Sequence, residues 1–231
     1  MNRIEEIISF LCDLEMNNNR TWFTRNKERY QSSLNAFCSV VDELILGISQ
    51  FDPTIQNLCA KDCTFRIYRD VRFSKDKSPY KIHMGAYICK GGKKSGYSGY
   101  YFHVGTGLGS EYPYSHMLAI GDYICDQRVL KVMREDICYD GNEFVNLVKK
   151  AEESHLMLDE DNSLRRVPSG FAADSPYERY LRLRNFCLYC TPDNRFMKDD
   201  NMVGNTLELF SIGKPFIDYV NRAIEYVKDS E

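Results

Sequence analysis

Apolar residues near the N-terminus recur with the period of an α-helix. Four of them lie at positions i, i+3, i+4 and i+7: Ile4, Ile7, Ile8 and Leu11. This spacing predicts an amphipathic helix over residues 3–15. A second apolar stripe predicts one long helix over residues 20–49, which the Asp52-Pro53 pair would close.

The middle of the chain instead alternates between apolar and polar residues, which is typical of half-buried strands. The predicted strands cover residues 64–74, 82–89, 97–104 and 116–124. The connections between the first three of them are too short for a helical crossover. Antiparallel pairing is therefore the simplest topology for this region.

The C-terminal half mixes both patterns. Helices are predicted over residues 126–137, 142–153, 176–184 and 215–228, and strands within residues 156–167 and over residues 185–191. No internal repeat or low-complexity linker divides the chain. We therefore expect a single α+β domain over residues 1–231, with a mainly antiparallel sheet, a long N-terminal helical hairpin and further helices packed on the sheet.

Residues 64–81, TFRIYRDVRFSKDKSPYK, combine the strand pattern with a high density of charge. The apolar residues up to Ser74 fall at odd positions, which places Arg66, Asp70 and Arg72 on the opposite face. Arg69 lies on the apolar side. Either a bulge turns this side chain into a solvent-lined cleft, or its guanidinium group is buried against a carboxylate, because an unpaired buried charge costs about 3–5 kcal/mol.

Two motifs in this chain resemble those of a bacterial conserved-hypothetical family, domain of unknown function 2461. The N-terminal motif N-N-x-x-x-W-F-x-x-N-K-x-x-Y is matched by Asn18, Asn19, Trp22, Phe23, Asn26, Lys27 and Tyr30. The motif R-I-x-R-D-x-R-F-S-x-D-K-x-P-Y-K is matched without a gap from Arg66 to Lys81, and a P-x-G-F segment follows at residues 168–171. The resemblance spans nearly the full chain and implies no assigned activity.

The distribution of charge indicates what kind of ligand these motifs could hold. The chain has a net charge of −3, yet residues 61–94 contain ten Lys or Arg and only three Asp. A local basic patch on an acidic body suits a small anionic ligand better than a long nucleic acid, for which a basic face usually dominates the domain. Nucleic-acid binding is therefore not expected.

The N-terminus and the cysteines bear on the compartment. Acidic residues interrupt the apolar run at the N-terminus, and no stretch approaches the roughly 20 apolar residues of a membrane span. Nine cysteines, an odd number without a secretory signal, suit reduced thiols. We expect a cytoplasmic protein that does not bind membranes, and nothing in the sequence indicates an oligomeric state.

The candidate site residues come from the two motifs and from a neighbouring strand. The predicted ligand-binding residues are Arg66, Arg69, Arg72, Lys77, Lys81, Asn26, Lys27 and Tyr80. The candidate acid–base residues are Asp70 and His103. For several of these an ordinary structural role is open: Asn26 and Lys27 could be solvated or anchor a loop, Asp70 could neutralise neighbouring cations, and His103 could be a core histidine.

No cofactor or metal site is predicted. Cys59 and Cys63 with Cys187 and Cys190 have the number of ligands that zinc needs, but an i, i+3 pair in a strand points to opposite faces. The run Gly105-Thr106-Gly107-Leu108-Gly109 lacks the spacing of a dinucleotide loop and favours a plain turn.

Two classes of function fit the basic stretch. The first is an enzyme or a binding protein for a phosphate- or carboxylate-bearing ligand. The second is a non-catalytic interaction module for protein or nucleic acid, in which Tyr80, Tyr87, Tyr100 and Tyr101 beside the cations would stack on a partner. A concave pocket lined by the motif would favour the first class, and a flat exposed basic face would favour the second.

Overall fold

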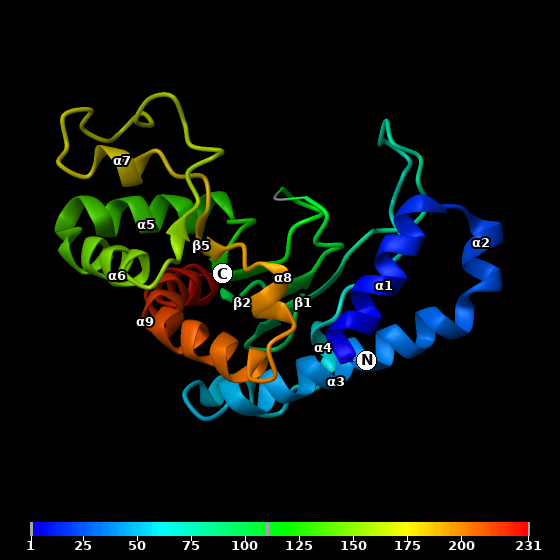
Figure 1. Ribbon diagram of the computed structural model, residues 1–231. Helices are drawn as coiled ribbons and strands as arrows, with labels where there is room; N and C mark the ends of the chain where they lie inside the picture. The colour runs from blue at the N-terminus through cyan, green and yellow to red at the C-terminus, as the bar shows by residue number, and fades with distance from the viewer. Residues whose placement is uncertain (1, 110, 231) are drawn as a thin grey trace. The chain divides into compact units, whose positions relative to one another are not determined.

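Two N-terminal helices pair through the apolar stripes of the sequence. In the computed structural model, which describes residues 2–109 and 111–230, α1 (Arg3–Met16) packs against α3 (Lys27–Ile48) (Figure 1). A capping box starts α1: the Asn2 side chain accepts from the Ile4 amide at 3.1 Å, and the Asn2 amide donates to Glu5 at 3.1 Å. The helix predicted over residues 3–15 is confirmed.

The single helix predicted over residues 20–49 is wrong, because Asn26 divides it. The short helix α2 (Arg20–Arg25) ends at Asn26, which has φ −106° and ψ 21°, and α3 begins at the next residue. The Asn26 side-chain amide donates to the Trp22 carbonyl at 2.9 Å. Asparagine competes in this way with helical backbone bonds, so α2 can leave the axis of α3 (Figure 1).

Five strands of the described chain form an antiparallel sheet in the order β1-β2-β3-β5-β4. They are β1 (Met84–Cys89), β2 (Gly99–Val104), β3 (Met117–Asp122), β4 (Met157–Leu158) and β5 (Phe186–Cys190). In the β4–β5 pair Met157 lies opposite Tyr189 and Leu158 opposite Leu188. The α+β class and the antiparallel sheet are therefore confirmed, although the region predicted as strand within residues 156–167 contributes only two residues to it.

The chain folds as two compact units that interleave in sequence. The first unit contains residues up to 94, 101–118 and 191–207, and the second contains residues 95–100, 119–190 and those from 208 onward. Strands β2 and β3 each contribute residues to both. A single domain over the whole chain stays a prediction.

The first unit carries both family-like motifs. Besides the helices already described it contains β1 and three short helical turns: η1 (Pro53–Ile55), α4 (Ala60–Cys63) and α8 (Asn194–Met197). Its core includes Phe37, whose ring packs on that of Phe102 in β2 at a centroid distance of 5.8 Å. This core supports β1 and β2, whose residues form part of the site described below.

The second unit is built around α5 (Gln127–Asp140) and α6 (Asn142–Glu152), which lie side by side (Figure 1). Both helices match their predicted positions. The helix predicted over residues 176–184 shrinks to one turn, α7 (Glu178–Leu181). Arg134 from α5 explains how this turn ends: its buried guanidinium group donates to the Leu181 carbonyl at 2.9 Å and to the Leu183 carbonyl at 2.7 Å, which satisfies carbonyls that a longer helix would use.

The last helix is twice as long as its pattern predicts. α9 (Met202–Asp229) begins 13 residues before the expected start at Pro215, and the proline lies inside the helix. Proline lacks a backbone N–H and is therefore common at the first position of a helix. For this reason the sequence pattern places the start of the helix at Pro215. The helix is closely packed just before the proline: at Gly213 a side-chain β-carbon would lie 2.3 Å from Ile120 of β3. Within the described residues, no helix is both long and apolar enough to span a membrane.

Candidate functional site

Residues 64–81, which we call the basic arm, form an extended hairpin and not the regular strand that their alternation predicts. Isolated antiparallel bridges join Thr64 to Ala86 and Tyr68 to Tyr80. Between its two limbs the Arg69 amide donates to the Pro79 carbonyl at 3.0 Å, and the Lys81 amide donates to the Ile67 carbonyl at 2.8 Å. The arm appears as the narrow teal projection in Figure 1.

The expected apolar face of the arm does not exist as a buried surface. This face would contain Phe65, Ile67, Val71 and Phe73. Only Ile67 among them is buried, and Phe73 at the far end is 96% exposed. A strand needs a neighbour that covers one face, and the outer part of the arm has none in the described structure. The strand prediction over residues 64–74 is therefore wrong.

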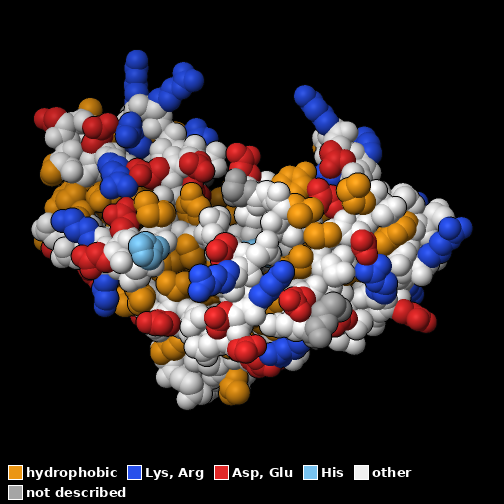
Figure 2. Space-filling view, in the orientation of Figure 1, with side chains coloured by type: hydrophobic (Ala, Val, Ile, Leu, Met, Phe, Trp, Pro, Cys, Tyr) orange, Lys and Arg blue, Asp and Glu red, His pale blue; other side chains and the backbone are white. Residues whose placement is uncertain are grey.

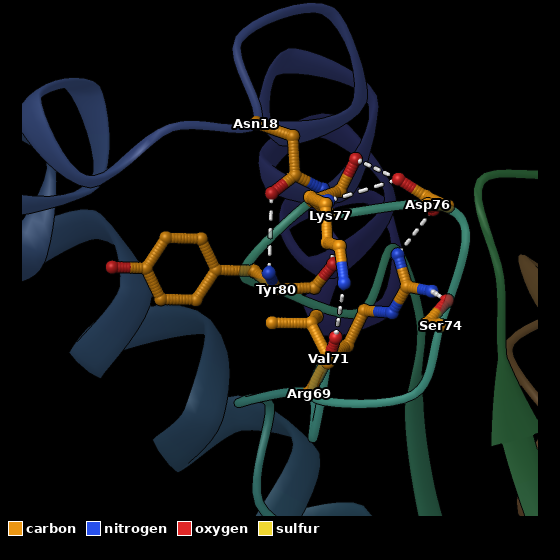
Figure 3. A network of polar contacts seen from close by, with 8 residues as sticks. Asn18, Arg69, Val71, Ser74, Asp76, Lys77 and Tyr80 are labelled. Atoms are coloured by element: carbon orange, nitrogen blue, oxygen red, sulfur yellow. Dashed lines mark hydrogen bonds and ion pairs between the residues drawn. The ribbon is translucent and has the colours of Figure 1, made fainter.

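Local side-chain bonds take the place of sheet pairing at the end of the arm (Figure 3). Asp76 accepts from both the amide of Ser78 at 2.9 Å and its hydroxyl at 2.7 Å, and it forms an ion pair with Arg69. The bonds from Ser78, followed by that from Arg69, hold the pKa of the Asp76 carboxyl well below its usual range. The Lys77 ammonium donates to the Val71 carbonyl at 3.0 Å.

Arg69 thus has a carboxylate partner, but the pair is not buried. The Arg69 side chain is 26% exposed and that of Asp76 is 60% exposed. Arg72 pairs in the same way with Asp70, at 2.6 Å. Two of the cations predicted to bind ligand therefore neutralise the two aspartates of the arm, and Asp70 serves as a counter-charge on an exposed limb. Figure 2 shows Lys and Arg side chains projecting around the end of the arm.

The N-terminal motif anchors the second limb of the arm. The Asn18 side chain pairs with the backbone of Tyr80 in both directions: its amide donates to the Tyr80 carbonyl at 3.0 Å, and its carbonyl accepts from the Tyr80 amide at 3.2 Å (Figure 3). The rings of Phe23 and Tyr80 stack with centroids 3.9 Å apart and an interplanar angle of 12°. The structure thus places Tyr80 in a buried aromatic cluster.

Asn26 and Lys27 are candidate residues that lie on the N-terminal helices and not on the basic arm. Asn26 ends α2 through its bond to Trp22 and also accepts from Arg29 at 3.5 Å. Lys27 is exposed on the first turn of α3, beside a shallow hollow lined by Thr24, Arg25, Glu28 and Gln31. No contact of either side chain with the basic arm is found among the described residues.

Lys81 is the cation of the arm that lies three residues before the start of β1. Its side chain is half-buried, its ammonium lies 5.5 Å from the centroid of the Phe65 ring, and it forms no ion pair with any described residue. Burial, and after it the neighbouring charge of Arg66, lowers the pKa of Lys81. Partial burial of a cation without a counter-charge is costly, so a bound anion would stabilise this position.

Two stacked imidazole rings lie next to Lys81. His83 and His103 have centroids 4.4 Å apart and an interplanar angle of 19°, and both are buried. Burial is the main cause that lowers the pKa of His83 to about 2, followed by His103, Lys81 and Arg69. Burial likewise lowers the pKa of His103 to about 4, partly opposed by the Pro113 carbonyl. Both rings are therefore neutral at pH 7.

Tyrosines flank this pair on both sides. The Tyr101 hydroxyl lies 2.9 Å from Nδ1 of His103, and the Tyr112 hydroxyl lies 3.4 Å from Nε2 of His83. Gly85 makes room for Tyr101, because a β-carbon at Gly85 would lie 2.7 Å from the Tyr101 hydroxyl. His103 is thus held on a strand of the sheet by a defined partner, and its role as an acid–base residue stays a prediction.

Sequence reasoning missed His83 and Tyr112. His83 could have been found from strand alternation, since Lys81, His83 and Gly85 share one face of an extended segment and Tyr101 and His103 share one face of the next strand. Tyr112 carries no such signal, because it lies in an irregular loop.

Two glycine amides of the run at residues 105–109 donate to protein groups. The Gly105 amide donates to Nδ1 of His116 at 3.3 Å, and the Gly107 amide donates to the Tyr114 carbonyl at 2.8 Å. The other nitrogen of His116 then carries the proton and donates to Asn194 at 3.1 Å. These amides do not converge on a phosphate position.

The cysteines considered for zinc lie in separate settings. In the first unit Cys59 caps α4 and Cys63 is its last residue, whereas Cys187 belongs to β5 in the second unit, as does Cys190. Burial raises the pKa of the Cys63 thiol to about 12, which disfavours the thiolate that binds metal. Across residues 2–109 and 111–230, no three His, Cys, Asp or Glu side chains are arranged to hold a metal ion.

A family model described as a conserved hypothetical protein, DUF2461, matches residues 6–219. The chain belongs to the DUF2461 family. Comparison with curated proteins and with solved structures gives no match. The matched range includes both motifs, so in this DUF2461 protein the N-terminal motif and the basic arm are parts of one packed structure, joined at Asn18, Phe23 and Tyr80.

Proposed function

We propose that this DUF2461 protein binds a small phosphate- or carboxylate-bearing ligand at the base of the basic arm, with Lys81 as the principal cation. The observation that carries the proposal is the half-buried ammonium of Lys81, which has no acidic partner among the described residues. Arg66, close enough to lower the pKa of Lys81, adds a second positive charge. An incoming anion would offset the repulsion between them.

The base of the arm, around Lys81, differs from its tip, around Asp70 and Asp76, in how the charges are paired. Near the tip Asp70 and Asp76 already neutralise Arg72 and Arg69, so these arginines have less to gain from a ligand. At the base, the cation neighbours two neutral imidazoles, each of which lies against a tyrosine hydroxyl. Partial burial there strengthens electrostatic attraction compared with an exposed position. A cytoplasmic location, and a bacterial source as the family resemblance implies, are part of this proposal.

Lys81→Met should weaken binding of inorganic phosphate and of acetate at least tenfold, which corresponds to about 1.4 kcal/mol. Methionine keeps most of the length of the side chain and removes the charge. Isothermal titration calorimetry would measure the affinities. Lys131→Met is the matched control, because Lys131 is an exposed lysine of α5 whose partner is Glu135. Equal affinities for the parent and Lys81→Met would contradict the proposal.

The affinity for acetate should also fall as pH rises. Because the pKa of Lys81 is lowered in the free protein and a bound anion would raise it, binding takes up a proton between these two pKa values. Affinity should be constant near pH 6 and decline at a pH below the usual lysine value of about 10.4. Lys81→Arg keeps its charge throughout, so it should bind acetate without this decline; a decline of the same size in that variant would assign the effect to another group.

The alternative function, a non-catalytic interaction module for protein or nucleic acid, is supported by one feature of the arm. Phe73 is almost fully exposed, and the Arg72 guanidinium lies 5.9 Å from the centroid of its ring. An exposed ring beside cations can stack on a base or a side chain of a partner. Phe73→Ala would abolish such binding and leave acetate binding at Lys81 unchanged, which separates the two functions.

A further inference from the structure

His83 contains a polar atom that the fold leaves unused. Its Nδ1 has no hydrogen-bond partner among the described residues, and the residue as a whole is only 7% exposed. Buried ring nitrogens are normally paired, because leaving one unpaired costs about 1–3 kcal/mol. The other nitrogen, Nε2, has the hydroxyl of Tyr112 at 3.4 Å, which is near the limit for such a bond.

Charged and titratable groups reach this ring from each element packed against it. Lys81 precedes it by two residues, His103 stacks on it from β2, Arg69 approaches from the arm, and Tyr112 comes from the following loop. No carboxylate is among the groups that shift its pKa. A hydrogen-bonding atom is thus placed next to the cation to which we assign the anionic end of the ligand.

The ring is neutral, which limits what it can recognise. One nitrogen of a neutral imidazole donates and the other accepts, and Tyr112 can bond either form. An anionic oxygen can only accept, so it fits Nδ1 in one tautomer alone. A hydroxyl group both donates and accepts, and it therefore fits Nδ1 in both tautomers.

We propose that His83 is a ligand-contacting residue of this site, and that with Lys81 it selects anions carrying a hydroxyl group beside the charge, such as 2-hydroxycarboxylates, over otherwise equal anions without one. This inference rests on the proposed function, because Lys81 must hold the charged group. The Tyr112 side chain, 58% exposed, contacts the same ring at Nε2 and leaves Nδ1 for the ligand.

The test compares glycolate with acetate, which differ by one hydroxyl group. By titration calorimetry at pH 7, the parent protein should bind glycolate at least tenfold more tightly than acetate, because a ligand that leaves a buried polar group unpaired is rejected. His83→Phe preserves a flat ring and removes both nitrogens. It should bind the two anions equally and keep the affinity of the parent for acetate within about threefold.

Two controls keep the outcomes distinct. His155→Asn removes an exposed histidine of the second unit, where residue 155 has φ 63°, a conformation that asparagine tolerates; it should keep the preference for glycolate. Nitrogen-15 NMR of the His83 ring in the parent protein requires no substitution at the site. Its Nδ1 resonance should shift with glycolate and much less with acetate.

Each result bears on one proposal. Equal binding of glycolate and acetate by the parent, or a preference that survives in His83→Phe, overturns the role of His83 and leaves the function of Lys81 standing. A shift of the Nδ1 resonance by both anions alike also overturns the selection. Failure of the parent to bind either anion, or full binding by Lys81→Met, overturns the proposed function itself.

Discussion

Phe23→Ala should lower the free energy of unfolding by about 3–5 kcal/mol, the usual cost of removing a buried aromatic ring. The Phe23 ring is 4% exposed and contacts four other rings, with centroid distances of 3.9 Å to Tyr80, 5.0 Å to Tyr30, 6.0 Å to Tyr68 and 6.4 Å to Phe10. Alanine would leave a cavity between the N-terminal helices and the arm. Urea denaturation followed by circular dichroism measures the change.

The backbone hydrogen bonds of the basic arm should open more often in Phe23→Ala than in the parent protein. Its second limb is held by the Phe23–Tyr80 stack and by Asn18, so the amide of Lys81, which bonds to the Ile67 carbonyl, should exchange its hydrogen faster. Phe73→Ala is the matched control: the same substitution at a ring that is 96% exposed should change stability by less than about 0.5 kcal/mol. Similar losses in both variants would refute the anchoring role of Phe23.

Gly121→Ala should destabilise the protein by at least about 4 kcal/mol, enough to abolish folding if the parent is marginally stable. Gly121 has φ 129°, which residues with a side chain rarely adopt, and it lies in β3. A β-carbon there would lie 2.1 Å from the Phe186 carbonyl oxygen and 2.9 Å from Cα of Cys187 in β5. Both contacts are with backbone, so no side chain can yield. The yield of folded protein and its thermal midpoint measure the effect.

Gly170→Ala measures the cost of a positive φ without the cost of a steric contact at the β-carbon. Gly170 also has a positive φ, 94°, but nothing lies within 4 Å of the position that its β-carbon would take. We expect a loss of only about 1–2 kcal/mol there, the cost of the unfavourable backbone conformation alone. If Gly121→Ala were as mild as Gly170→Ala, β3 and β5 would be packed less closely than the structure shows.

Local patterns predicted the parts of this fold that depend on local interactions. Ile4, Ile7, Ile8 and Leu11 predicted α1, and the alternations at residues 82–89, 97–104 and 116–124 predicted β1, β2 and β3. Two errors occurred where distant groups decide the outcome: Arg134 ends α7 from another helix, and α9, packed against Ile120 of β3, continues through Pro215. The third has a local cause, because Asn26 divides a continuous apolar stripe through its bond to Trp22.

The candidate site shows the same division. The sequence identified the residues of the basic arm, including Lys81, and its likeness to a family that the comparison confirms. It assigned similar roles to all of the cations, because charge density along a chain does not reveal which charges pair. The structure pairs Arg69 with Asp76 and Arg72 with Asp70, and distinguishes Lys81 from them by burial.

The sequence by itself determined the α+β class, the antiparallel order of the first strands and the location of a basic segment, because periodicity, loop length and charge are properties of neighbouring residues. Only the tertiary structure decided that Asn18 and Phe23 hold the arm at Tyr80, and that His83 stacks on His103 beside Lys81. These contacts join residues 20 to 62 positions apart. Their energies come from burial and stacking between separate segments, which no local pattern records.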